Sequence, residues 1–273
     1  RGTIPQGRYR LPVTGHWSLF LDGPRAGWEN MAVDSALLDL ADGEGAAVLR
    51  LYRWEPFCLS FGRHEPTARR YDLERIHTLG LDCVRRPTGG RAVWHARELT
   101  YAVAAPLACF GGMRDAYHRI HAMLAAALQA LGASPELAPL SPKPQSPSPS
   151  SGPCFSTPVG GEVLLDNRKV IGSAQLRQGD AVLQHGSLLL EDDQSLPRSL
   201  AGLASPESGD AEAPLSRSLG RRVSFEEAVA AVTGAAQVHF GPLLPQSRLP
   251  SALTTRVRLH AERFQDPAWT WQR

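Results

Sequence analysis

The hydrophobic positions along the chain predict helices and strands in mixed order. Apolar residues recur close to helical spacing in four segments, which are residues 28–41, 69–80, 113–132 and 224–232. Gly80 and Gly132 end two of them, as glycine commonly does. Ser224 opens the last segment and Glu227 stands three positions later, which is the order of a helix-capping box.

Short apolar runs between turn residues predict strands. They are residues 47–54, 57–62, 82–86, 91–96, 99–106 and the alternating stretch 161–191. Residues 166–167 (DN) and 178–180 (QGD) supply the turns of that last stretch. Strands and helices do not alternate as regular βαβ units. The pattern therefore predicts an α+β fold, with a mixed, mostly antiparallel sheet flanked by helices.

Two stretches rich in proline and serine interrupt this pattern. They lie near residues 134–153 and 192–220 and are predicted to be irregular. With 273 residues, the chain is long enough for a sizeable core. We expect a single domain over residues 1–273, with these two stretches as loops.

Composition narrows the class of protein. Hydrophobic residues make up 42% of the chain and charged residues 21%, which is ordinary for a globular protein. The net charge of +2 argues against a dedicated nucleic-acid-binding protein, which carries a basic excess. No apolar run approaches the roughly 20 residues that span a bilayer, and residues 1–17 lack the apolar core of a signal peptide. We expect a cytoplasmic, monomeric protein that binds neither nucleic acid nor membrane.

The four cysteines form no metal or redox motif. No two are spaced as Cys-x-x-Cys, so we expect neither a zinc cluster nor a thioredoxin-type site. We also expect no other metal and no cofactor. Cys58, Cys83 and Cys109 lie in strand-like apolar segments, where buried free cysteine is common. Cys154 differs, because proline, glycine and serine precede it. Its context leaves two interpretations open, a surface thiol on a loop or a nucleophile.

Residues 85–101, RRPTGGRAVWHARELTY, form the first candidate site. Two adjacent glycines between predicted strands let the backbone approach a ligand closely. The guanidinium groups of Arg85, Arg86 and Arg91 suit phosphate, carboxylate or an acidic carrier protein. A plain hairpin with a solvated basic rim fits the same spacing, so this stretch alone does not decide the function.

Residues 168–187 form the second candidate site. If the chain folds back at the 166–167 turn, Lys169 returns toward the start of the preceding strand and hence toward Cys154. A thiolate beside an ammonium suits acyl transfer, because the thiolate attacks a carbonyl and the cation stabilises the charge. Considered alone, Lys169 is equally well explained as a solvated charge, and His185 as a structural histidine.

Together, these stretches resemble the biotin/lipoate protein ligase superfamily. The resemblance is strongest to its branch of octanoyl-[acyl-carrier-protein]:protein N-octanoyltransferases of the lipoate-protein ligase-like type. The segment NMAVDSALL is similar to the family's early helix, and RRPTGGRAVWHARELTY to its substrate-site turn and strands. CF, followed by RKVIGSAQLRQGDAVLQHGSLLLEDD, is similar to the second half of the site, and FQDPAWTWQR to the closing segment. The order is kept from about residue 17 to the end.

The resemblance implies a biotin/lipoate ligase-like domain that binds an eight-carbon acyl chain. It implies Cys154 as the nucleophile and Lys169 as the residue that assists it. The substrate-binding positions that it implies are Arg86, Thr88, Gly89, Gly90, Arg91, His95, Gly172, Ser173, Ala174, Gln175, His185 and Gly186. Residues 158–162, PVGGE, depart from the family's Ser-x-Tyr before this glutamate.

The implied reaction moves an octanoyl group from octanoyl-acyl-carrier protein, through a thioester on Cys154, to a lysine of a lipoyl-domain protein. Such acceptors are the glycine cleavage H protein and the acyltransferase subunits of 2-oxoacid dehydrogenases. His95 and His185 are open candidates for the base that deprotonates this lysine. The backbone amides around Gly89 and Gly172 are candidates for holding the thioester oxygen.

Three alternatives stay open at this point. The first is an ATP-dependent lipoate-protein ligase, although the motif cysteine, and Arg91 where ligases have a third glycine, favour a transferase. The second is an amidotransferase that moves the acyl group between two lipoyl-domain proteins. The third is a catalytically silent member that only binds acyl groups or carriers.

Overall fold

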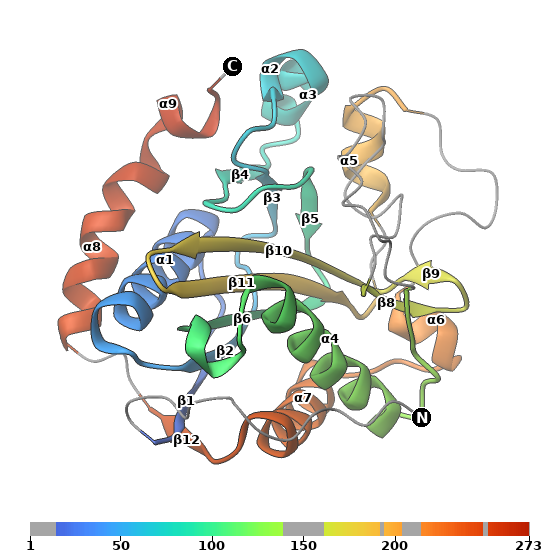
Figure 1. Cartoon of the computed structure of the whole chain (residues 1–273). Coiled ribbons are helices and arrows are strands. Elements are labelled where there is room, and N and C mark those ends of the chain that lie inside the picture. The colour runs from blue at the N-terminus through green and yellow to red at the C-terminus, as the bar shows by residue number, and fades with distance from the viewer. Residues whose placement is uncertain (1–14, 139–160, 192–193, 204–213, 248–250, 273) are drawn as a thin grey trace.

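A computed structural model describes residues 15–138, 161–191, 194–203, 214–247 and 251–272 (Figure 1). Its largest sheet has six strands, in the spatial order β10 (Ile171–Gln178), β11 (Ala181–Leu189), β6 (Glu98–Pro106), β2 (Val48–Tyr52), β1 (Trp17–Leu21) and β12 (Leu243–Gln246). The first four strands pair antiparallel, whereas β1 is parallel to both of its neighbours. The mixed, mostly antiparallel sheet is therefore confirmed.

Two small sheets accompany the large one. One has the order β4 (Asp82–Arg85), β3 (Cys58–Phe61) and β5 (Val93–His95). The other has the order β7 (Glu136–Leu137), β8 (Val163–Leu165) and β9 (Arg168–Lys169). Because β9 leads directly into β10, this third sheet places its residues beside the edge of the large sheet.

Helices cover both faces of the large sheet (Figure 1). Helix α1 (Gly27–Glu44) packs on one face and carries α8 (Ser251–Gln265) on its outer side. Helices α4 (Met113–Ala130) and α7 (Phe225–Phe240) pack together on the other face. Strand β2 shows why the sheet needs both layers. Leu49 and Leu51 lie in the hydrophobic cluster beneath α4 and α7, whereas Val48 and Tyr52 lie in the cluster beneath α1.

Several predictions from the sequence are confirmed. The helices predicted at residues 28–41, 113–132 and 224–232 correspond to α1, α4 and α7, although α4 ends two residues earlier, at Ala130, and Ser224 is the N-cap of α7. The predicted cap is present, because the Ser224 hydroxyl accepts a hydrogen bond from the Glu227 backbone N–H at 3.0 Å. The predicted hairpin is present too. Leu164 pairs with Lys169, and both turn residues, at 166–167, have positive φ, as a two-residue hairpin requires.

Two predictions were wrong in part. Residues 69–80 belong to two helices, α2 (Thr67–Arg70) and α3 (Leu73–Thr78), because Asp72 caps the second by accepting a hydrogen bond from the Arg75 N–H at 2.9 Å. The range 192–220 is not wholly irregular. It contains α5 (Ser195–Leu200) and α6 (Leu215–Leu219), whose Leu200 and Leu215 are buried in hydrophobic clusters. Residues 139–153 lie outside the described part of the chain.

Arg85 joins the final helix, α9 (Pro267–Thr270), to strand β4. Its guanidinium is fully buried and donates to the carbonyl oxygens of Trp269, Thr270 and Gln272. It also donates to the carbonyl of Gly62, in the loop after β3. Arg85 is therefore a structural residue and not part of a solvated basic rim, the alternative that the sequence left open.

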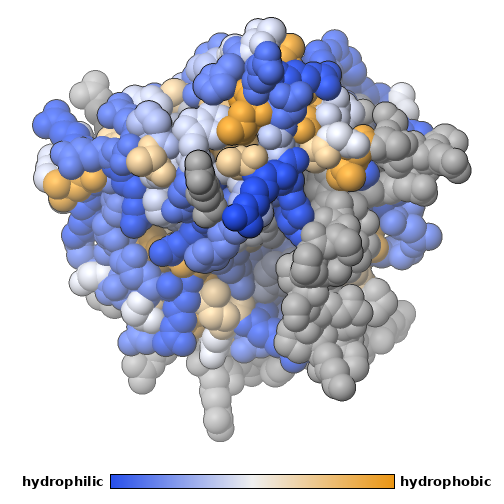
Figure 2. Space-filling view, turned by 90° about the horizontal axis from the view of Figure 1, so that it is seen from above, coloured by the Kyte–Doolittle hydropathy of each residue, from blue (hydrophilic) through white to orange (hydrophobic). Residues whose placement is uncertain are grey.

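No helix in the described part of the chain is long and apolar enough to cross a bilayer. Figure 2 shows the surface seen from above. On that face hydrophobic residues lie in several separate groups among hydrophilic ones.

Candidate active site

A small, mostly apolar pocket lies between α1, β5 and the β10 end of the large sheet. Its lining residues come from seven segments and are Met31, Tyr52, Trp54, Arg86, Val93, His95, Thr100, Gly172, Ser173, Ala174, His185, Gly186 and Ser187. Seven of the positions implied by the family resemblance are thus brought together here: Arg86, His95, Gly172, Ser173, Ala174, His185 and Gly186. Among the described residues, no group of three or more His, Cys, Asp or Glu side chains could hold a metal ion.

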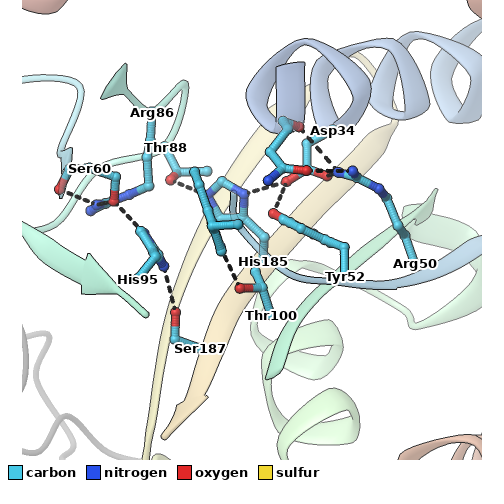
Figure 3. A network of polar contacts seen from close by, with 12 residues as sticks. Asp34, Arg50, Tyr52, Ser60, Arg86, Thr88, His95, Thr100, His185 and Ser187 are labelled. Atoms are coloured by element: carbon cyan, nitrogen blue, oxygen red, sulfur yellow. Dashed lines mark hydrogen bonds and ion pairs between the residues drawn. The ribbon is translucent and has the colours of Figure 1, made fainter. Parts of the chain in front are cut away.

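A buried carboxylate organises one side of the pocket (Figure 3). Asp34 of α1 accepts hydrogen bonds from Arg50 at 2.7 Å, from the Tyr52 hydroxyl at 2.9 Å and from His185 Nδ1 at 2.8 Å. Burial by itself would raise the pKa of Asp34, but the His185 hydrogen bond and the Arg50 charge outweigh it and hold the pKa below its ordinary value. His185 Nε2 in turn lies 2.6 Å from the Thr88 hydroxyl.

A second buried network of hydrogen bonds is centred on Glu98. Its Oε1 accepts from His95 Nδ1 at 2.7 Å and from the Ser187 hydroxyl at 2.9 Å. His95 Nε2 lies 2.6 Å from the Ser60 hydroxyl, which also accepts from Arg86. Because a carboxylate only accepts, the His95 imidazole carries its proton on Nδ1, toward Glu98. Burial lowers the pKa of His95, so the ring is neutral at pH 7.

Both pocket histidines have their two ring nitrogens occupied within the protein (Figure 3). Neither can take a proton from a substrate unless one of these hydrogen bonds breaks first. The two rings therefore offer the pocket no free polar nitrogen, and His95 in addition stacks on Trp54 with ring centres 4.0 Å apart. With Met31 and Val93, these rings make an apolar lining.

Glycine has no β-carbon, and this allows the turn at residues 88–90 to pack closely against its neighbours. A β-carbon on Gly62 would overlap the carbonyl oxygen of Gly90, so the turn at residues 88–90 rests directly on the end of β3. Gly186 is required in the same way, because a β-carbon there would overlap the Gly172 carbonyl of the neighbouring strand. Gly89, Gly90 and Arg91 are partly or fully exposed beside the pocket.

Arg86, by contrast, is buried. It donates to the Ser60 carbonyl and hydroxyl and to the carbonyls of Gly89 and Arg91, which hold the turn in shape. Only 5% of its surface is exposed, so it cannot contact the surface of a carrier protein, a role that the sequence left open for it.

Lys169 lies in a buried ion pair on β9. Its Nζ is 2.6 Å from Glu162 Oε1, and each residue is 2% exposed. Lys169 lies three positions before Gly172, the first β10 residue that lines the pocket. Glu162 is the glutamate of the PVGGE segment, for which the sequence predicted no role in the site.

On the α4 face of the large sheet, a series of hydrogen bonds connects the backbone next to Glu162 to strands β10 and β11. His121 of α4 lies 2.7 Å, through Nδ1, from the Gly161 carbonyl, and 2.8 Å, through Nε2, from the Ser173 hydroxyl. A carbonyl only accepts, so Nδ1 donates to it, and Nε2 accepts from Ser173. Ser173 is bonded to Tyr101, which accepts from Gln184. Gln175, the last predicted substrate residue, donates to Gln184 in this same series.

This arrangement predicts a pH-dependent contribution to stability. Burial, the main cause, together with the Lys169 and His118 charges, lowers the pKa of His121 to about 4 against the pull of the Gly161 carbonyl. The folded pKa is below the unfolded value of 6.5, so the contribution is full above pH 6.5 and is lost as the pH falls toward 4.

Urea unfolding between pH 7 and pH 4 measures this effect. Between pH 7 and pH 4, the free energy of unfolding of wild-type protein should fall by up to about 3 kcal/mol more than that of His121→Gln. His95 titrates in the same direction in both proteins, so it does not contribute to the difference. An equal pH dependence of the two proteins would show that folding does not lower the pKa of His121.

Cys154, the predicted nucleophile, lies outside the described residues. The other three cysteines are free thiols. Burial raises the pKa of Cys83 to about 12 and of Cys109 to about 11, and raises the pKa of Cys58 well above its ordinary value. None of these three forms a thiolate readily near neutral pH, in agreement with the structural role expected for them.

Comparison with known protein families shows which family has a domain of this kind. The model of the lipoyl protein ligase A/B catalytic domain matches residues 26–237, a range that contains every residue of the pocket and the Glu162–Lys169 pair. The chain belongs to the lipoyl protein ligase A/B family. The resemblance found in the sequence is thereby confirmed.

Curated members of this family include two relatives named octanoyltransferase LipM. The one from Moorella thermoacetica is 41% identical over 179 residues, an alignment that covers 64% of this chain and 65% of the relative. The chain thus spans slightly less than two thirds of that relative. The one from Symbiobacterium thermophilum is 35% identical over 262 residues, which cover 90% of this chain and 93% of the relative.

Solved structures of family members share the fold. Lipoate-protein ligase A bound with ATP superposes with a TM-score of 0.78 at 18% identity, over 94% of this chain and 98% of the other. The bipartite lipoate-protein ligase of Thermoplasma acidophilum gives 0.73 at 17% identity, over 94% and 96%. These identities establish the fold alone, and they confirm the ligase-like architecture expected from the sequence.

Proposed function

We propose that this member of the lipoyl protein ligase A/B family transfers an octanoyl group to a lysine of a lipoyl-domain protein, by way of a thioester on Cys154. The observation that carries the proposal is an apolar pocket lined by Gly172, Ser173 and Ala174, in a chain that buries the Lys169 ammonium three residues before Gly172. Polar groups around the pocket are bonded to one another, so the walls suit a hydrocarbon chain. The names of the two relatives, octanoyltransferase, support the same acyl group.

The reaction has two steps. The Cys154 thiolate attacks the thioester carbon of octanoyl-acyl-carrier protein, the bond from that carbon to the carrier sulfur breaks, and the carrier leaves as a thiol. The lysine amine of the lipoyl domain then attacks the new thioester. An amide forms, the bond from the carbonyl carbon to the Cys154 sulfur breaks, and the amine proton ends on that sulfur. The first step exchanges one thioester for another, whereas the amide is more stable and draws the sequence forward without ATP.

Lys169 stabilises negative charge in both steps. Its ammonium favours the thiolate over the thiol and then the oxyanion that forms during attack. Glu162 fixes the position of this ammonium by the 2.6 Å contact. The buried histidines are not assigned the role of base, because their ring nitrogens are occupied. The departing sulfur of Cys154 takes the proton instead.

Intact-mass spectrometry tests the proposal. After incubation with octanoyl-acyl-carrier protein, wild-type protein should gain the mass of one octanoyl group, and Cys154→Ser should gain none that hydroxylamine removes as a thioester. Cys83→Ser is the matched control, because Cys83 is a partly exposed thiol of raised pKa, and it should gain the same mass as wild type. An unchanged wild-type mass, or a thioester that survives in Cys154→Ser, would refute the acyl-enzyme.

The same assay separates the alternatives. A ligase would modify the lipoyl domain with lipoate and ATP, and would do so in Cys154→Ser as well. An amidotransferase would take the acyl group from an octanoylated lipoyl-domain protein and not from the carrier. A silent member would bind the carrier and gain no mass.

A further inference from the structure

Helix α4 is bonded to the backbone that leads into the Glu162–Lys169 ion pair. Its His121 is fully buried and donates from Nδ1 to the Gly161 carbonyl at 2.7 Å. That carbonyl belongs to the peptide group that joins Gly161 to Glu162, and the Glu162 carboxylate lies 2.6 Å from the Lys169 ammonium. Helix α4 packs against β7 and β8 in this region (Figure 1). One imidazole therefore fixes the peptide group next to the carboxylate that holds the ammonium.

The rest of the His121 ring is fixed as well. Burial lowers its pKa to about 4, so the ring is neutral at pH 7 and Nε2 accepts from the Ser173 hydroxyl on β10 at 2.8 Å. The Tyr117 ring packs against it in a T-shaped arrangement, with centres 4.0 Å apart. Because both nitrogens are bonded and the ring is packed, the imidazole has one orientation, and the Gly161 carbonyl is held in one direction.

Residue 161 has to be glycine for this contact to form. Its φ is +87°, which other residues rarely adopt, and a β-carbon there would lie 2.9 Å from the His118 ring. Position 161 is the one at which the family pattern has the tyrosine of Ser-x-Tyr, before the glutamate. Its replacement by glycine lets His118 and His121, one helical turn apart on α4, approach the backbone there. The departure from the family pattern and the His121 contact are therefore parts of one local arrangement.

We infer that His121 is a positioning residue for the acyl transfer: it holds the Gly161–Glu162 peptide group, and through Glu162 it fixes the place of the Lys169 ammonium. The inference rests on the proposed function, in which this ammonium favours the Cys154 thiolate, and it adds a residue to that mechanism. His121 takes up no proton in the reaction. Without it, the carboxylate and the ammonium stay paired but shift together, and a displaced charge stabilises the thiolate less.

The experiment measures the pKa of the Cys154 thiol from the rate of its alkylation by iodoacetamide, from about pH 5 to about pH 10. Peptide mass spectrometry separates Cys154 from the other three cysteines. Wild-type protein should give a value below the ordinary thiol pKa of about 8.5, and Lys169→Met a value of about 8.5 or above. His121→Ala should raise the pKa by about one unit, which is a tenfold loss of thiolate at a pH well below both values.

Two conservative variants show which contact carries the effect. Asparagine places its amide nitrogen close to the position of Nδ1, so His121→Asn still donates to the Gly161 carbonyl. Glutamine places its amide close to Nε2, so His121→Gln keeps a partner for Ser173 and loses the one for Gly161. The Cys154 pKa should stay close to the wild-type value in His121→Asn, and it should rise in His121→Gln as it does in His121→Ala.

Leu128→Ala is the matched control for lost stability. Leu128 lies on the same helix, is fully buried in the hydrophobic cluster beneath it and does not line the pocket. The substitution should destabilise the fold, as truncation of a buried leucine does, and keep the wild-type Cys154 pKa. Because an unfolded chain has an ordinary thiol pKa, this control also shows how much of any rise comes from unfolded protein.

The outcomes are distinct. A raised pKa in His121→Ala and His121→Gln, with the wild-type value in His121→Asn and Leu128→Ala, supports the inference. An unchanged pKa in His121→Ala, or an equal rise in His121→Asn or Leu128→Ala, overturns it and leaves the proposed function standing. A wild-type pKa that Lys169→Met does not change would show that the ammonium does not act on Cys154, which overturns this part of the proposed function and the inference with it.

Discussion

Lys169→Met protein is expected to lose both stability and activity. The substitution leaves the Glu162 carboxylate buried without its 2.6 Å cation. Removing one member of a buried pair typically costs about 3–5 kcal/mol, because the remaining charge is uncompensated. Urea unfolding should show a loss of that size. Octanoyl transfer by the fraction that stays folded should fall at least about 100-fold, the usual effect of removing a group that stabilises an oxyanion.

A double variant separates the two effects. In Lys169→Met/Glu162→Leu the buried charge is gone as well, so most of the unfolding free energy should return. Transfer should stay lost, because the double variant still lacks the Lys169 ammonium that stabilises the thiolate and the oxyanion. Arg177→Met, which removes an exposed member of the Arg177–Asp180 pair on β10, is the matched control and should change stability by less than about 0.5 kcal/mol. If the double variant regains transfer together with stability, Lys169 is only structural.

Asp34→Ala is expected to cause the second largest loss in the free energy of unfolding. It removes the acceptor of three buried hydrogen bonds and the carboxylate that faces the fully buried Arg50. We expect a loss of about 3–5 kcal/mol in urea unfolding at pH 7. In wild type the Asp34 pKa lies below its ordinary value of 3.8, so this contribution is complete above that value and is lost only as the pH falls further.

Asp39→Asn provides the control for that measurement. Asp39 lies on the same helix and pairs with His260 at 2.7 Å, but both side chains are part-exposed. Exposed pairs typically contribute about 0.2–1 kcal/mol, so this variant should stay close to wild type. Equal losses in Asp34→Ala and Asp39→Asn would mean that burial of the Asp34 network contributes little.

Local patterns in the sequence predicted much of the fold. The helix containing Ser224 and Glu227 and the hairpin at Asp166 were predictable because each is decided by residues that are neighbours in the chain. The split between α2 and α3 was missed because the Asp72 cap outweighs an otherwise continuous pattern. The second irregular stretch was misjudged because Leu200 and Leu215 fold into helices through contacts with distant residues.

The site was predictable only in part, for the same physical reason. Glycine-rich and lysine-containing motifs mark Gly90, Gly172 and Lys169 directly in the sequence. Asp34 and Glu162, in contrast, are ordinary acidic residues in the sequence, and only the folded chain brings them against His185 and Lys169. A buried partner for each basic motif residue was a signal that could have been sought, because an unpaired buried cation is costly.

Strand β11 connects the two sides of the molecule in a way that limits how it can be assembled. Gln184 points to the α4 side, where it bonds Tyr101, and the next residue, His185, points to the α1 side, where it bonds Asp34. A slip of one residue would exchange the two side chains and leave both polar networks without their partners. The register of β11 is therefore specified twice, once from each face of the sheet. A chain in the wrong register would lose the hydrogen bonds of both networks at once.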